Sequence, residues 1–581
     1  MTGSDLNPPA AGASIPAVPR AALLFVVVAA GCARSPAPVR RAPSVLLVTV
    51  DTLRADRLGC YGDERARTPT IDRLARAGTL FENAFTPVPI TLASHASILT
   101  GLIPPAHGVR GNGGFALGPV PTLATALRSR GLATGAFVGG FPLARRFGLD
   151  RGFDVYDDAM EKPAGVNYEL AERRADAVAE AARAWLGGRA GPVFLWAHFF
   201  DPHTPYDPPP AFRGDDPYRG EIAAVDAALG RLLEAWDARD GRSLVVFTAD
   251  HGEAFGEHGE VSHSLFVYDV TLRVPLILGG DGVPRGRRVA TAVGITDLAA
   301  TVARVAGDGP PLPGRDLLSA RLPPAPLYAE TLAPRLDFGW SDLRSWREGR
   351  YKLIRAPRPE LYDVSADPAE ARNLAAAQPE LLRRMSGALD AALAASGEKD
   401  SARAADAESV ERLRTLGYVQ GPGGRGSGAD PKDEVEVARR IAAAVGPFPD
   451  YEAVVRAYRE IARLDPPNPL VNFRLADALL RSGKPQEAVA CFRKVLAAGP
   501  RTAEAHVGLA TAYAQLGRVD EAEKALRLGL HVDPGNGQAH YNLGEVARAR
   551  GDLAGARADY EAALADPVTR DRARARLDAL R

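Results

Sequence analysis

Three short apolar runs that end in metal-ligand residues constrain most strongly what this chain can fold into. The runs and the polar residues that follow them are 44–50 (SVLLVTV) before Asp51, 193–198 (VFLWAH) before Asp201 and His203, and 243–248 (SLVVFT) before Asp250 and His251. Continuous apolar runs of this length are typical of strands buried in a parallel sheet. In such sheets, ligands bind beyond the carboxyl ends of the strands, which is where these polar residues fall.

The stretches between the runs carry the hydrophobic periodicity of helices. These stretches are 68–78, 91–99, 121–131, 167–187 and 219–237. Strands that alternate with helices predict a doubly wound, mostly parallel α/β sheet. Because 581 residues are too many for one hydrophobic core, we expect at least one further domain.

The charge balance gives no indication of a nucleic-acid partner, and the cysteines give no indication of a structural zinc site or disulfides. Lys plus Arg and Asp plus Glu number 71 each, so no net field would concentrate nucleic acid at the surface. Cys32, Cys60 and Cys491 lack the paired spacing of a zinc knuckle or a disulfide framework. We therefore expect no nucleic-acid partner.

An apolar segment near the N-terminus resembles a bacterial lipoprotein signal. Arg20 precedes the run 21–30 (AALLFVVVAA), and Cys32 follows shortly after it. The run is too short to span a bilayer, so we expect residues 1–32 to form a lipoprotein signal. Its apolar segment would be removed, which leaves Cys32 as the lipid-bearing N-terminus of the mature chain. Residues 33–43 would then tether an exported, membrane-anchored protein in the cell envelope, facing the periplasm. The alternatives are a plain signal peptide, an uncleaved anchor and a cytoplasmic protein.

An internal repeat marks the C-terminal region. The positions that recur every 34 residues are Gly483, Gly517 and Gly551, and Ala488, Ala522 and Ala556. This pattern resembles the tetratricopeptide repeat, in which glycine occupies the turn between two helices and alanine permits close packing. We expect an all-α solenoid at 434–581 after a polar linker at 395–433. Its groove would bind a protein or peptide partner; a rigid spacer or dimerisation surface is the alternative.

The stretch 91–101 (TLASHASILTG) resembles the signature of sulfatases in the alkaline phosphatase superfamily. The resemblance places Thr91 at the nucleophile and His95 at the family's arginine. Sulfatase nucleophiles are formylglycines made from cysteine or serine, and threonine cannot form that aldehyde. Threonine is instead the nucleophile of superfamily members that act on phosphate diesters, including nucleotide phosphodiesterases and phosphoethanolamine transferases.

The chemistry of a hydroxyl nucleophile supports this assignment of Thr91. A threonine alkoxide forms readily only where a metal ion and a helix N-terminus stabilise its charge, and Thr91 is predicted to begin a helix. The alternatives are a helix-capping role for Thr91 and a degenerate, inactive site.

Four residues are predicted to hold a divalent metal ion: Asp51, Thr91, Asp250 and His251. The motif at 250–253 (DHGE) resembles the superfamily's metal motif, which in typical sulfatases is Asp-Asn with calcium. Thr52 stands where those enzymes have a second aspartate. The resemblance therefore favours zinc or manganese over calcium, with one or two ions.

Two further histidines, His203 and His263, are predicted to act in catalysis. His203 matches the family's His-x-Pro element, and His263 follows His251 at the separation found in phosphoethanolamine transferases. They would bind a second zinc or contact the ester and its leaving group, and the sequence leaves both alternatives open. Ser262 replaces the lysine that sulfatases often carry there.

The roles of four other polar residues stay open. Asp201 is either a metal ligand or a residue that forms a turn before Pro202. Three residues of the loop after the predicted nucleophile helix either border the pocket or are structural: His107, Arg110 and Asn112. Further resemblance at 296–307, 351–354 and 361–374 extends the catalytic domain, with a C-terminal hairpin subdomain, over 44–394.

The sequence thus predicts a metal-dependent hydrolase or transferase. Its substrates would be phosphate-type or sulfate-type esters of small molecules, lipids or glycans, attacked by Thr91. Two alternatives remain: a sulfatase-like hydrolase with a mechanism that needs no formylglycine, and an inactive domain that serves with the repeats as a protein-interaction scaffold.

Overall fold

The computed structural model describes residues 42–160, 172–307, 311–399, 427–444, 450–499, 502–566 and 568–580. The predicted lipoprotein signal, including Cys32, and nearly all of the predicted tether lie outside these residues. Within them, no helix combines the length and the apolar character needed to cross a membrane.

The main sheet has nine strands, in the spatial order β4-β3-β5-β1-β6-β7-β2-β8, with β9 paired to β2. The central strands are β1 (Ser44–Val50), β5 (Val193–Phe199), β6 (Ser243–Ala249), β3 (Ala133–Val138) and β4 (Val155–Asp157). All pairings among these five strands are parallel. The predicted doubly wound, mostly parallel sheet is confirmed.

Antiparallel pairing enters the sheet at β7, which follows β6 in the sheet order. The strands of this half are β2 (Thr79–Phe85), β7 (Arg273–Gly280), β8 (Arg287–Val289) and β9 (Val293–Gly294). β7 runs antiparallel to both of its neighbours, β6 and β2. The sheet is therefore mixed toward this edge, which the apolar runs alone did not indicate.

Eight α-helices of the described residues accompany the main sheet. They are α1 (Pro69–Ala77), α2 (Thr91–Thr100), α3 (Pro104–His107), α4 (Leu123–Ser129), α5 (Ala175–Gly187), α6 (Pro217–Asp237), α7 (Asp269–Leu272) and α8 (Asp297–Val305). Five of them, α1, α2, α4, α5 and α6, correspond to the periodic stretches of the sequence. Contacts join α1, α5 and α6 in one group and α2, α4 and α8 in another. α5 begins at Ala175, later than the expected residue 167, and Arg173 pairs with the loop at Gly139 instead.

A second, smaller sheet follows the main sheet in the chain. Its four antiparallel strands are β10 (Leu327–Thr331), β11 (Leu343–Glu348), β12 (Tyr351–Arg355) and β13 (Glu360–Asp363). α9 (Ala333–Phe338) lies between β10 and β11 in the chain, and α10 (Pro379–Ser396) contacts β11 and β12. Met385 and Leu389 of α10 are fully buried against this sheet.

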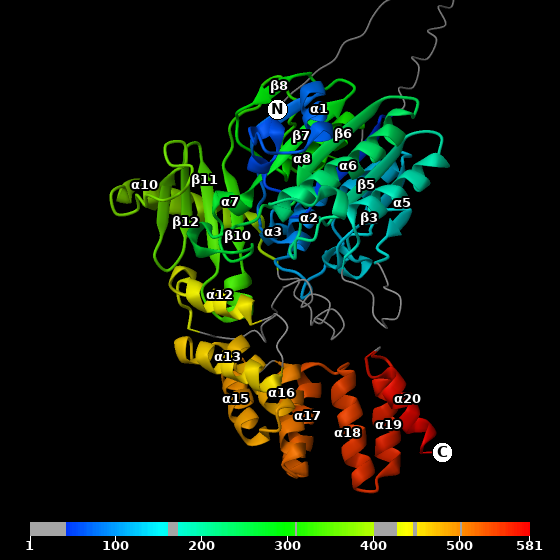
Figure 1. Cartoon of the computed structure of the whole chain (residues 1–581), viewed down its shortest axis with the longest axis vertical. Helices are drawn as coiled ribbons and strands as arrows, with labels where there is room; N and C mark the ends of the chain where they lie inside the picture. Colours follow the sequence, from blue (N-terminus) through cyan, green and yellow to red (C-terminus); the bar gives the residue numbers. More distant parts are fainter. Residues whose placement is uncertain are drawn as a thin grey trace, which may run out of the picture. The chain divides into compact units, whose positions relative to one another are not determined.

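Helices make up the described C-terminal region from residue 435 onward (yellow to red in Figure 1). They are α12 (Val435–Ala443), α13 (Tyr451–Leu464), α14 (Pro469–Arg481), α15 (Pro485–Ala498), α16 (Ala503–Gln515), α17 (Val519–Val532), α18 (Gly537–Ala549), α19 (Leu553–Ala563) and α20 (Arg570–Asp578). The predicted helical repeat array is thus present.

The recurring residues occupy the positions that the repeat requires. Gly483, Gly517 and Gly551 follow α14, α16 and α18 with φ of 73°, 73° and 79°. This left-handed conformation is costly for any residue with a Cβ atom, which explains why glycine recurs there. The recurring alanines are at most 1% exposed, so they let the paired helices approach closely.

We expect Gly517→Val to weaken the second repeat locally. A β-branched residue in the left-handed region costs about 1–2 kcal/mol, so hydrogen-exchange protection of α16 and α17 should fall by roughly tenfold. Gly535→Ala is the matched control, because Gly535 lies in the next turn of the array without a positive φ. Equal loss of protection in both variants would contradict this explanation.

Candidate active site

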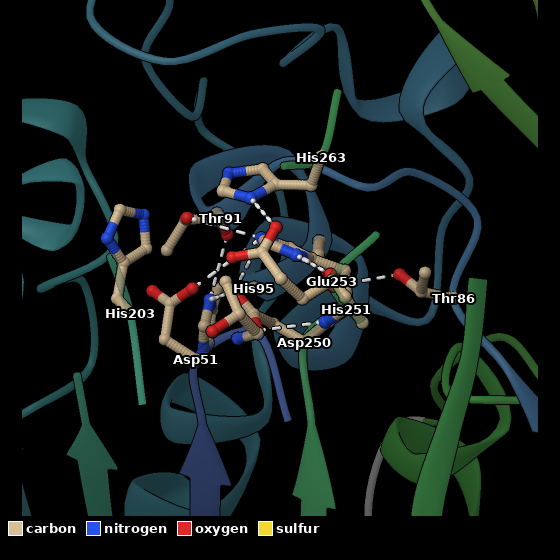
Figure 2. Close-up of polar contacts among 12 residues, drawn as sticks. Asp51, Thr86, Thr91, His95, His203, Asp250, His251, Glu253 and His263 are labelled. Carbon is tan, nitrogen blue, oxygen red and sulfur yellow. Dashed lines mark hydrogen bonds and ion pairs between the residues drawn. The ribbon is translucent and has the colours of Figure 1, made fainter. Parts of the chain in front are cut away.

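The parallel register of three strands brings the predicted site residues together. Val50 on β1 pairs with Phe199 on β5 and with Ala249 on β6, so the three strands end at the same level. Asp51 and Asp250 are the next residues along β1 and β6. Figure 2 shows them converging with Thr91 and His251 beyond the strand ends.

Asp51, Asp250 and His251 form a fully buried cluster that could hold a metal ion. His251 Nε2 lies 3.6 Å from Asp51 Oδ1 and 3.4 Å from Asp250 Oδ2. Ligand atoms around one ion at about 2.0–2.2 Å are separated by roughly 3.0–3.6 Å, so these separations suit a shared ion. His251 Nδ1 donates to the carbonyl of Gly252 (3.0 Å), which leaves the lone pair on Nε2 facing the carboxylates.

The carboxylates of this cluster lack the hydrogen bonds that buried charges need. Both oxygens of Asp51 and Oδ2 of Asp250 have no well-formed hydrogen bond among the described residues, although Thr91 contacts the Asp51 carboxyl. Burial raises the pKa of Asp51 to about 7, and burial together with the charge of Asp51 raises the pKa of Asp250 to about 8. The donor set therefore fits a divalent cation, which would compensate both carboxylates.

Thr91 is the first residue of α2, and its hydroxyl faces the cluster. Thr91 Oγ1 lies 3.5 Å from His251 Nε2. The residue before the helix is Ile90, and the amide of Leu92 donates to Asn112 Oδ1 (3.0 Å). Asn112, not Thr91, accepts this hydrogen bond at the start of the helix, so the Thr91 hydroxyl is not needed as a cap. It faces the cluster instead, where the helix N-terminus favours negative charge.

His95 is neutral and engaged through both ring nitrogens. Its Nδ1 donates to the carbonyl of Thr91 (2.8 Å), and its Nε2 accepts from the hydroxyl of Thr49 (2.9 Å). Burial lowers its pKa to about 3, so this side chain brings no positive charge to the position of the family's arginine. Although His95, His198 and Asp250 lie close enough to share an ion, His95 has no lone pair left for one.

His198 on β5 is a residue of this site that sequence reasoning did not single out. The amide of Gly139 donates to His198 Nδ1 (3.4 Å), which places the ring proton on Nε2, 3.5 Å from Asp51 Oδ2. His198 is thus oriented to donate toward Asp51. Its position as the last residue of the predicted apolar run was the only signal in the sequence.

His203 and His263 lie beside the cluster, as expected. The His263 ring is 4.5 Å from the His251 ring and 5.4 Å from the His203 ring, measured between centroids. Among the described residues, neither group of three ligands that could share one ion includes His203 or His263. Their position beside the cluster is compatible with both predicted roles, a second ion and contact with the ester or its leaving group.

Glu253 fixes the orientation of His263. His263 Nδ1 lies 3.0 Å from Glu253 Oε1, and the hydroxyl of Tyr206 donates to Glu253 Oε2 (3.0 Å). Glu253 is fully buried, and this burial raises its pKa to about 7. Glu253 belongs to the motif at 250–253, but its role could not be predicted from the sequence, because Tyr206 and His263 meet it only in the fold.

Thr52 and Asp201 have structural partners that account for them. The Thr52 hydroxyl donates to the carbonyl of Pro202 (2.7 Å), which joins the loops after β1 and β5. Asp201 Oδ2 accepts from the amide of Ala175 (2.7 Å) at the start of α5, and Asp201 Oδ1 pairs with Arg174 (3.0 Å). These contacts favour the turn-forming alternative for Asp201 over the ligand alternative.

The loop residues after α2 also have structural contacts. His107 Nε2 is 2.9 Å from Ser97 Oγ, and Arg110 pairs with Glu330 and with Glu398. With Asn112 capping α2, these contacts account for all three loop residues. They hold the loop in place rather than pointing to a chemical role.

Comparison with known proteins agrees with this geometry. The Sulfatase family pattern matches residues 43–308, and the tetratricopeptide repeat pattern matches 473–536 and 524–570. The chain carries a sulfatase-family domain followed by tetratricopeptide repeats. The predicted resemblance and the predicted class, an enzyme of the sulfatase family, are thereby confirmed.

Individual relatives extend over more than the matched domain. Steryl-sulfatase of Mus musculus is 27% identical over 430 residues, covering 52% of this chain and 68% of the relative. Arylsulfatase A of Homo sapiens is 27% identical over 462 residues, covering 62% of this chain and 89% of the relative.

Solved structures share the fold of the sulfatase-family domain. The phosphonate monoester hydrolase of Agrobacterium radiobacter has a TM-score of 0.50 at 23% identity, covering 61% of this chain and 96% of the other. A protein solved with its substrate D-glucosamine-2-N,6-O-disulfate has a TM-score of 0.54 at 18% identity, covering 62% and 99%. At these identities the likeness concerns the fold alone.

We expect a divalent ion to stabilise the sulfatase-family domain through Asp51 and Asp250. Addition of Zn²⁺ or Mn²⁺ to chelator-treated protein should raise the thermal unfolding midpoint by several degrees, because an ion that binds only the folded state stabilises it by mass action. Asp250→Asn should abolish this increment. Asp201→Asn is the control and should retain it, and loss of the increment in both variants would contradict the ligand assignment.

We expect Glu253→Ala to lower kcat by roughly 10- to 100-fold with KM changed less than about threefold, since removal of a partner that orients a functional histidine typically costs that much. Glu253→Gln can still accept from His263 and should retain most of kcat. Steady-state kinetics of the three proteins test this. Equal losses in Ala and Gln variants would show that the charge, not the orientation of His263, is what matters.

Proposed function

We propose that the sulfatase-family domain is a metal-dependent hydrolase or transferase of phosphate-type or sulfate-type esters with Thr91 as its nucleophile. The observation that carries the proposal is the position of the Thr91 hydroxyl, at the start of α2 and 3.5 Å from His251 Nε2 in a cluster that fits a divalent ion. A threonine cannot supply formylglycine, so the site needs another way to activate its nucleophile.

The charge of the site supports a role for the ion. The charged or ionisable groups that shift the pKa values of Asp51 and Asp250 most are carboxylates and histidines, with no lysine or arginine among them. Without a cation, two carboxylates would repel an anionic ester. A divalent ion held by Asp51, Asp250 and His251 would neutralise this charge and lower the pKa of the Thr91 hydroxyl. Imidazole in the donor set favours zinc over calcium, and the resemblance at 250–253 adds manganese as the second candidate.

In the proposed reaction, Thr91 forms and breaks the bond to phosphorus, and His263 transfers a proton. Thr91 Oγ1 forms a bond to phosphorus as the bond from phosphorus to the alcohol oxygen breaks, and the hydroxyl proton leaves with the alcohol. Water then attacks the phosphothreonine; neutral His263, held by Glu253, accepts a proton from this water and returns it to Thr91 Oγ1. A second acceptor in place of water would make the enzyme a transferase.

The cluster also argues against the scaffold alternative. Keeping an unpaired buried charge costs roughly 3–5 kcal/mol, so a domain that had lost its activity would gain stability by replacing Asp51 or Asp250. The repeats still support a protein or peptide partner, and export through residues 1–32 stays a prediction from the sequence.

The test is a comparison of initial rates on 4-nitrophenyl phosphate, bis(4-nitrophenyl) phosphate and 4-nitrophenyl sulfate, with Zn²⁺ or Mn²⁺ added. We expect phosphate-ester turnover that falls by at least ~10³-fold in Thr91→Ala and is partly retained in Thr91→Ser. Sulfate turnover that dominates, or turnover that survives Thr91→Ala, would overturn the nucleophile assignment.

A further inference from the structure

A cavity of about 150 Å³ lies beside His263 and is walled in part by α12, the helix that precedes the repeats. Its lining comes from Thr204 after β5, from the loop 259–265, from α9 and from α12. Among the lining residues are His263, Leu265, Phe338, Ala438, Arg439 and Ile441. The Sulfatase family pattern ends at residue 308, so the parts of the wall that come from α9 and α12 lie outside the matched domain.

α12 is fixed against the loop that carries His263. Arg439 Nε donates to the carbonyl of Gly259 (3.1 Å). Gly259 has φ of 86°, and a Cβ atom there would lie 2.5 Å from Cγ1 of Val435, so α12 packs directly on the backbone of this loop. Ile441 is 1% exposed and shares a hydrophobic core with Leu265.

The residues just before α12 are tied to the small sheet. Lys432 Nζ lies 2.9 Å from Glu360 Oε1, and the Glu360 carboxylate is 4% exposed. The amide of Arg358 donates to Asp430 Oδ2 (3.0 Å). These buried polar contacts, together with the apolar contacts of Ile441, make α12 a fixed wall of the cavity.

The size and lining of the cavity define what it would accept. An apolar cavity of about 150 Å³ accommodates a ring the size of benzene. Most of the cavity surface is apolar and comes from Val261, Leu265, Phe338, Ala438 and Ile441. Besides His263, the polar residues that line it are Thr204, Glu260, Ser262, Ser264, Asp337 and the exposed Arg439. Its preferred ligand is therefore a ring-sized apolar group.

His263 links the cavity to the reacting centre. It lines the cavity, and its ring also lies 4.5 Å from the ring of His251 in the metal cluster. A group bound in the cavity would therefore lie next to His263, which in turn lies next to the metal cluster and Thr91.

We propose that this cavity binds a ring-sized apolar portion of the alcohol of the ester substrate, which makes α12 a determinant of substrate specificity. The inference rests on the proposed function, because it assigns the cavity to the leaving group of that reaction. It predicts that the segment before the repeats contributes to substrate selection although it lies outside the matched family domain.

The test fills the cavity from α12 with Ala438→Phe. We expect KM for 4-nitrophenyl phosphate to rise at least tenfold, whereas the inhibition constant of inorganic phosphate stays within twofold, because phosphate needs no cavity. Ala443→Phe is the matched control, since Ala443 is exposed on the same helix and does not line the cavity. If Ala438→Phe lowers the unfolding midpoint, Ala442→Phe, at an exposed lining position, replaces it.

An unchanged KM, or an equal rise in KM and in the phosphate inhibition constant, would overturn the proposal. Binding of 4-nitrophenol, followed by ligand-observed NMR, separates this outcome from failure of the proposed function. Binding to the wild-type chain that is lost in the filled variant supports the cavity even if no ester is hydrolysed. Absence of binding to the wild-type chain overturns the cavity assignment whatever the activity.

Discussion

The burial of two carboxylates at the ends of neighbouring parallel strands is the constraint on which the rest of the site depends. β1 and β6 are in register, so Asp51 and Asp250 follow the two strands at the same level, and both side chains are fully buried. Buried carboxylates are costly unless a cation or several donors compensate them. Three features surround these carboxylates with groups that favour a cation or negative charge. They are the N-terminus of α2 at Thr91, the Nε2 lone pair of His251 and the Nε2 proton of His198, which faces Asp51.

Much of this arrangement could be predicted from the sequence because it follows from strand ends. The apolar runs predicted the parallel strands, and Asp51 was predicted from the end of the first run. The resemblance at 91–101 and 250–253 added Thr91, Asp250 and His251, and the fold brings all four residues together. The antiparallel strand β7 was not predicted, since its apolar character is compatible with either direction.

What the sequence could not supply were the contacts between distant segments. The role of Glu253 follows from its contacts with Tyr206 and His263, which lie far from or beyond the motif in the chain. For Asp201, the sequence allowed a ligand role, whereas in the fold its carboxylate accepts from the amide of Ala175 at the start of α5. The same holds for α12, which belongs to the expected repeat region yet packs on the loop of His263. A domain boundary inferred from composition does not report such packing.

The most direct test of the central claim is to trap the covalent intermediate. The chain would be mixed with Zn²⁺ and an activated aryl phosphate, quenched in acid within the first turnover, and digested for mass spectrometry. The account predicts one phosphoryl group on Thr91 that is absent after treatment with a chelator. Ser94 and Ser97 carry the two serine hydroxyls of α2, the helix that Thr91 begins. Phosphorylation of either serine in place of Thr91, or full turnover without any covalent adduct in the first turnover, would contradict the account.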